Sequence, residues 1–119
     1  MLWWKRRTVD DVIEDFILAR QADGRAPRTI QDYHRVLEPF AAWCREKRLS
    51  VKSLNREHVR EYVANLRSRG WAEATVNIHI RNLRAFLRWL YEEGHTSNNL
   101  AKTIKAPSKI VRMEEPLTS

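Results

Sequence analysis

The sequence of 119 residues contains little cysteine, glycine or proline. Its one cysteine, Cys44, excludes an internal disulfide framework and disfavours a cysteine-based metal site. Three glycines and four prolines provide few of the turns that a β architecture needs. No apolar run approaches the roughly 20 residues of a membrane span, and "MLWWKRR" becomes charged too soon for a signal peptide. We therefore expect a soluble, cytoplasmic protein without a membrane partner.

The composition favours one compact helical domain. Hydrophobic residues make up 43% of the chain, and five Trp, three Tyr and three Phe provide bulky core side chains. Lys and Arg number 22 against 15 Asp and Glu, which gives a net charge of +7. A charge of this size indicates an anionic partner, most commonly nucleic acid, although it also suits a solubilising surface. The position of the charge on the folded chain distinguishes these alternatives.

Apolar residues recur at helical spacing in four segments. The first predicted helix covers residues 8–23 and is capped by Thr8. The second covers residues 27–47; it begins at Pro27, and Pro39 in its interior should bend it. Asn55 caps the third, which ends at Gly70. The fourth covers residues 73–94, and a short fifth helix is expected over residues 100–104. The predicted fold is all-α: a compact bundle of four main helices, with residues 1–7 as a basic lead, 8–105 as the domain, and 106–119 as an exit linker.

The fourth helix carries polar residues beside its apolar stripe. At about 100° per residue, Val76, Ile80, Leu83, Phe86, Leu87 and Leu90 form one arc. Four side chains spaced by four, three and four residues form a straight row next to it: Asn77, Arg81, Arg84 and Arg88. Arg can bond guanine bidentately and Asn can bond adenine, and both can hold phosphates.

The second helix carries a similar row. Arg28, Gln31 and Arg35 lie away from its apolar stripe, with Thr29 near the edge, and Asp32 offsets part of the charge. The first helix differs, because five acids and one Arg give residues 8–23 a charge of −4. Each basic row is also consistent with the solvated face of an amphipathic helix. In a chain of charge +7, however, the two rows together favour contact with double-stranded DNA.

Residues with other chemistry are few. The four histidines lack a two-ligand spacing on any one helix, so no metal site is predicted. The three tyrosines lie on or beside apolar stripes, where packing is their expected role, and Cys44 occupies a core position. The sequence contains no glycine-rich phosphate loop and no pattern of nucleophile and base. We therefore predict neither a cofactor nor catalysis by this chain alone.

The order of these features resembles a known family. "APRTIQDYHRVLEPFAAWCREKRL", followed by residues 54–108, is similar to the core-binding, N-terminal SAM-like domain of tyrosine recombinases and phage integrases. The resemblance includes Thr29 and Tyr33 in the second helix, the pattern from Thr75 to Trp89, and "NNLAKTIKAP" before an interdomain linker. The sequence departs from the family pattern at three places. Ala26 stands where a Ser cap is common and Pro39 interrupts the second helix, and both affect the pose of that helix. Asn99-Leu100 replaces the usual Asn-Pro and affects only the fifth helix.

The resemblance implies a domain that forms half of a clamp around DNA, with its second and fourth helices facing the major groove of a recombination site. Positions carried over from the family are Thr29, Arg35, Thr75, Asn77, Arg81 and Arg84. It also implies that catalysis belongs to a separate C-terminal domain, so that this chain alone is monomeric and does not cut DNA. The full-length protein is then expected to form a tetramer on DNA of the nucleoid. Backbone attraction at the two ends is expected from Lys5, Arg6, Arg7, Lys102, Lys105 and Lys109.

Two alternatives remain open at this level. A helical protein-interaction module could use the same basic rows to bind an acidic protein, because small helical bundles host many functions. A nonspecific DNA binder would bind a recombination site and a scrambled duplex equally well.

Overall fold

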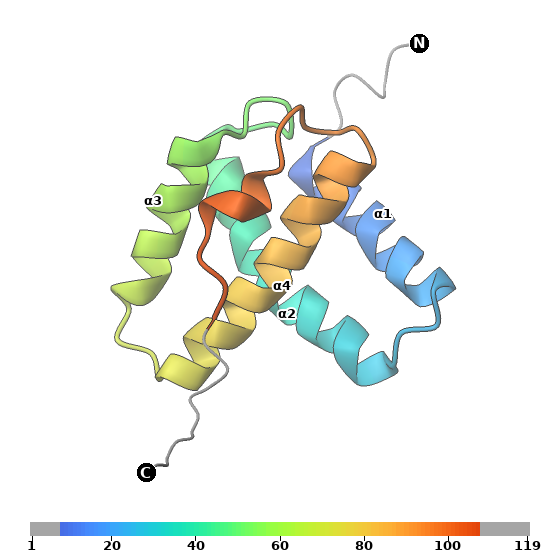
Figure 1. Ribbon diagram of the computed structural model, residues 1–119, viewed down its shortest axis with the longest axis horizontal. Helices are drawn as coiled ribbons and strands as arrows, with labels where there is room; N and C mark the ends of the chain where they lie inside the picture. The colour runs from blue at the N-terminus through green and yellow to red at the C-terminus, as the bar shows by residue number, and fades with distance from the viewer. Residues whose placement is uncertain (1–7, 108–119) are drawn as a thin grey trace.

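The computed structural model describes residues 8–107, which form four α-helices and one 3₁₀ helix (Figure 1). The helices match the expected segments, and no strand occurs within these hundred residues. The fifth element is 3₁₀ rather than α. The basic residues expected at positions 5–7 and at Lys109 lie outside the described residues. The elements are α1 (Val9–Ala22), α2 (Pro27–Glu46), α3 (Arg56–Arg67), α4 (Glu73–Glu92) and η2 (Leu100–Thr103).

Local residues account for the starts of α1 and α3 and for the end of α4. The Thr8 side chain accepts a bond from the Asp11 N–H at 3.1 Å, and the Asp11 carboxylate accepts from the Thr8 N–H at 3.3 Å, which makes a capping box. Asn55 accepts from the His58 N–H at 3.0 Å. Gly94 follows α4 with a φ of +83°, a conformation that glycine adopts without steric cost. Helix α2 runs through Pro39 without a break; the bend expected there stays a prediction.

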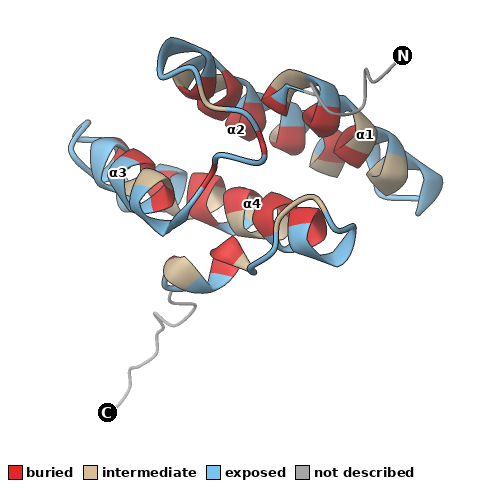
Figure 2. Cartoon of the chain, turned by 90° about the horizontal axis from the view of Figure 1, so that it is seen from above, coloured by how far each residue is buried: buried red, intermediate tan, exposed pale blue. Residues whose placement is uncertain are grey.

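The helices form two layers with the apolar residues between them. Figure 2 shows α1 and α2 in one layer and α3 and α4 in the other, with η2 on the outer side of the second layer. Helices α2 and α4 cross near their middles, so their N-terminal halves diverge toward the same end of the molecule (Figure 1). Each residue of the apolar arc predicted for α4 is buried, as are His79 and Trp89. Helix α4 therefore has neighbours on most of its circumference.

Edge-to-face aromatic contacts hold the layers together. The Phe16 ring of α1 lies 4.9 Å from that of Tyr33, 5.3 Å from that of Phe86 and 5.4 Å from that of Trp89, measured between centroids. This geometry suits the quadrupoles of the rings. One fully buried side chain thus fixes α1 against both α2 and α4.

None of the helices in the described part of the chain has both the length and the apolar character needed to cross a bilayer. Cys44 is buried, as expected of a core residue, and desolvation, with the charge of Asp10, raises the pKa of its thiol to about 12. A thiol with such a pKa stays protonated at neutral pH, so Cys44 is unsuited to act as a nucleophile.

Phe16→Ala should lower the free energy of unfolding by about 3–5 kcal/mol, since it removes a fully buried ring and leaves a cavity between three helices. Urea unfolding followed by circular dichroism measures this. The control is Leu18→Ala on the same helix, where the side chain is 65% exposed and the expected change is below about 0.5 kcal/mol. Equal losses in the two variants would contradict the packing described for α1.

Candidate nucleic-acid interface

Arg84 lies in the predicted basic row of α4, but its guanidinium is used within the domain. Its Nη1 donates to the carbonyl oxygen of Ala101 at 2.8 Å and also to that of Ile104. The side chain is part-buried against η2 and satisfies carbonyl groups at the end of that short element. Helical periodicity placed Arg84 beside the apolar arc correctly, but it gave no indication that η2 covers this side of the helix.

The remaining members of that row form a narrow strip, which we call the outer strip: Asn77, Arg81 and Arg88. Arg81 is exposed and has no ion-pair partner within residues 8–107. Arg88 reaches Glu92 only at 3.9 Å, with both side chains well exposed, so this pair contributes little. Asn77 is half-buried. The outer strip therefore carries two cations that solvent can reach.

The predicted row of α2 is largely open to solvent. Arg28 and Gln31 are exposed and Thr29 is half-buried. Arg35 is 64% exposed and donates to the Asp32 carboxylate at 2.7 Å, so Asp32 offsets part of the charge of this row. Surface pairs of this kind are weak, so Arg35 can exchange its partner for another anion at small cost.

A basic and aromatic cluster at the start of α4 was not predicted from the sequence. Arg69 donates to the Asn65 side-chain oxygen through Nε at 3.1 Å and Nη2 at 2.8 Å. Its guanidinium lies 5.0 Å from the centroid of the Trp71 ring, a cation–π distance. The centroid of the Trp71 ring in turn lies 4.9 Å from that of the buried His79 ring. The segment "RSRGW" could have indicated this cluster, because it places two basic residues and a Trp in a turn, where they belong to no apolar stripe.

Two guanidinium groups lie close enough to the buried His79 to affect its pKa. Burial lowers this pKa, and the positive charges of Arg35 and then Arg69 lower it further. His79 Nδ1 is buried and has no hydrogen-bond partner among residues 8–107. Thr75, one helical turn before His79, lies on the same side of α4. Residues from α2, from the turn before α4 and from α4 itself thus lie around His79, with Asp32 and Glu38 beside Arg35 and Glu46 beside Arg69.

We call this region the Arg35 surface and define it by six residues: Arg28, Gln31, Arg35, Arg69, Trp71 and Thr75. His79 lies beneath it. Two residues along a helix are turned by about 200°, so Asn77 and Arg81 lie on nearly the opposite side of α4 from His79. The row of α4 therefore faces away from His79, whereas Arg35 of the α2 row lies near it together with Arg69 and Trp71.

Comparisons with known proteins agree with this architecture. The model of the family described as phage integrase, N-terminal SAM-like domain, matches residues 12–96. Tyrosine recombinase XerD of Rhizobium meliloti is 25% identical over 107 residues, which cover 89% of this chain and 34% of that protein. XerD of Brucella suis is 29% identical over 98 residues, covering 82% and 32%. XerC of Salmonella typhi is 31% identical over 83 residues, covering 69% and 28%.

A solved structure has the same fold. It is the N-terminal domain of a phage integrase/site-specific recombinase from Haloarcula marismortui, with a TM-score of 0.78 at 21% identity. The match covers 84% of this chain and 96% of that one. The chain spans about a third of the length of the curated relatives it matches. The family resemblance found in the sequence is confirmed, and so is the all-α fold.

Arg84→Ala should lower the free energy of unfolding by about 1.5–3 kcal/mol, because it removes charged hydrogen bonds to two carbonyl groups of the η2 segment. Urea unfolding measures the change. Arg88→Ala is the matched control on the same helix, with an expected change below about 0.5 kcal/mol. If both variants unfolded like the wild type, the bond from Arg84 to η2 would have no structural role.

The lowered pKa of His79 should make stability depend on pH. The unfolded chain takes up the His79 proton near the usual pKa of 6.5, whereas the folded chain takes it up only at lower pH. Stability is therefore fully present above pH 6.5 and is lost as the pH falls below it. Comparing urea unfolding at about pH 7.5 and about pH 5.5 tests this. In His79→Gln the fall in stability should be smaller; an unchanged fall would contradict the expectation.

Proposed function

Because the chain belongs to the family of phage integrase N-terminal SAM-like domains, we propose that it is the core-binding domain of a site-specific tyrosine recombinase. Its role would be to grip one half of a DNA recombination site. The Arg35 surface supports this proposal best, since it brings cations of α2 and of the turn before α4 to one exposed aromatic ring.

The chemistry of the Arg35 surface suits duplex DNA. Arg28, Arg35 and Arg69 present guanidinium groups that can hold phosphates or bond guanine bidentately. Gln31 offers an amide for adenine, and Thr75 a hydroxyl for phosphate. The fixed position of Arg69, between Asn65 and Trp71, reduces the entropy lost when it binds. A duplex lying there would meet the diverging N-terminal halves of α2 and α4.

The outer strip has a secondary place in the proposal. Asn77, Arg81 and Arg88 lie on the other side of α4, where a straight duplex on the Arg35 surface would not reach them. They would contact DNA only if it bent around the helix. Arg84, although predicted as a contact, would act on DNA chiefly by holding η2 in place.

We assign strand cleavage and rejoining to a separate catalytic domain of the full-length protein, since the curated relatives are tyrosine recombinases about three times as long as this match. The domain alone would bind DNA as a monomer without cutting it. The full-length protein would assemble on DNA as a tetramer, in the cytoplasm and in association with the nucleoid. No residue of the chain is given a catalytic role.

The DNA proposal is tested by titrating the domain with labelled duplex at several salt concentrations between about 50 and 200 mM. Each phosphate contact contributes close to one unit to the slope of log affinity against log salt concentration. Arg35→Gln with Arg69→Gln should weaken binding and reduce this slope by about two. Asn77→Ala with Arg81→Gln should have less effect, because these residues belong to the outer strip.

The matched control is Arg25→Gln with Arg48→Gln, which removes the same charge at exposed positions outside the Arg35 surface and the outer strip. If the control lowered affinity as much, net charge rather than a surface would govern binding. Equal affinity for a recombination site and a scrambled duplex would identify a nonspecific binder. Strong binding to an acidic protein with none to DNA at low salt would favour the protein-interaction module.

A further inference from the structure

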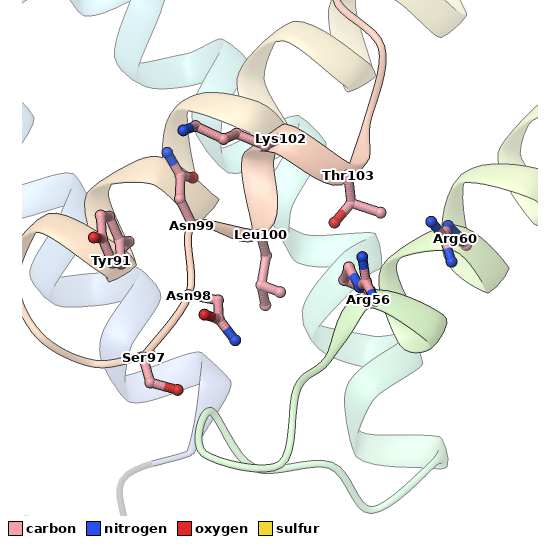
Figure 3. Close-up of a pocket in the computed structure, with 9 residues that line it drawn as sticks. All are labelled: Arg56, Arg60, Tyr91, Ser97, Asn98, Asn99, Leu100, Lys102 and Thr103. Carbon is pink, nitrogen blue, oxygen red and sulfur yellow. The ribbon is translucent and has the colours of Figure 1, made fainter.

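A polar trough lies between the N-terminal end of α3 and the segment that follows α4. It consists of two adjoining cavities of about 670 Å³ and about 440 Å³. The cavities share Arg56, Ser97, Asn98 and Leu100, so they are continuous. Figure 3 shows the larger one, with Arg56 and Arg60 on one side and Lys102 on the other. None of the residues assigned to the Arg35 surface or the outer strip lines this trough.

The trough is lined by cations and neutral hydrogen-bonding groups. Four of its residues, Lys52, Arg56, Arg60 and Lys102, carry a fixed positive charge, and no Asp or Glu lines either cavity. Arg60 pairs with Glu57 at 3.2 Å, but both side chains are more than half exposed, so the pair is weak. The neutral groups include the amides and hydroxyls of Ser97, Asn98, Asn99 and Thr103. Together they favour an anionic ligand.

The trough and the Arg35 surface lie at opposite ends of the same two helices. Arg56 and Arg60 are in the first turns of α3, whereas Asn65, which holds Arg69, is near its last turn. Tyr91 lines the trough at the end of α4, whereas Thr75 belongs to its first turn. One short duplex on the Arg35 surface would therefore leave the trough open.

We propose that the trough is a second binding site for the sugar–phosphate backbone of DNA. Phosphates require only cations and neutral donors, and the trough provides both. A protein partner would instead need buried apolar anchors. The trough offers few of these, since Leu54 and Leu100 are buried within the domain and Tyr91 is the one Phe, Tyr or Trp among the residues that line the two cavities. The site goes beyond the proposed function, because it lets one domain hold two DNA segments.

The experiment measures how many short duplexes one domain binds when duplex is in excess at low salt, by sedimentation velocity with separate absorbance of protein and DNA. The wild-type domain should bind two. Arg56→Gln with Lys102→Gln should bind one, with the affinity of the first binding event unchanged. Both side chains are exposed and lack ion-pair partners within residues 8–107, so the variant should unfold like the wild type.

Two further variants make the outcome specific to the trough. Arg25→Gln with Arg48→Gln removes the same charge elsewhere and should still bind two duplexes. Arg35→Gln with Arg69→Gln should bind one, through the trough. If that variant bound two duplexes while the trough variant bound one, the trough would stand and the proposed Arg35 surface would fail.

One duplex per wild-type domain, or two in the trough variant, would overturn the inference. A polyglutamate peptide serves as a second probe at matched ionic strength. When the concentration of its carboxylates equals that of the DNA phosphates, this peptide should not displace the second duplex. Displacement at equal charge would show that the trough takes acidic protein segments, and would also overturn the inference.

Discussion

The burial of α4 is the constraint on which the rest of the structure depends. This helix contacts α1, α2, α3 and η2, and eight of its twenty residues are buried. A helix enclosed to this degree can present polar residues only where its neighbours leave gaps. One gap follows the outer strip, and another lies near its N-terminal end, where Thr75 is exposed above the buried His79. The positions of the surrounding elements therefore decide which basic residues of the domain reach solvent together.

The consequence is electrostatic. Arg35 and Arg69 come from different elements, yet both act on His79 from nearby and disfavour its charged form. Repulsion between such like charges makes the folded domain slightly less stable. A bound anion removes this repulsion and so restores the lost stability. Asn65 and Trp71 keep Arg69 in place without neutralising it. Arg35 is held only by a weak surface pair with Asp32, and Arg69 has no ion-pair partner among residues 8–107. Such cations beside an exposed aromatic ring are suited to a nucleic-acid backbone.

Much of the fold was predictable because helix periodicity and capping are local. The apolar arc of α4, the caps at Thr8 and Asn55, and the burial of Cys44 all follow from nearby residues. The candidate site was less predictable, because periodicity gives the direction of a side chain but not its neighbour. Arg84 lies beside the apolar arc as expected, but periodicity gave no sign that it binds η2; its contact with DNA stays a prediction. Arg69 and Trp71 were missed because they lie in a turn, where no period applies.

The central claim is that DNA binds at the Arg35 surface. Nuclear magnetic resonance titration tests it most directly, with a labelled domain, a short duplex and side-chain signals of Arg Nε–H and Trp indole N–H. The account predicts that the signals of Arg35, Arg69 and Trp71 move at the lowest duplex concentrations and return when salt is raised. It would be contradicted if those signals stayed fixed while DNA was bound, with the first changes confined to Arg81 and Arg88.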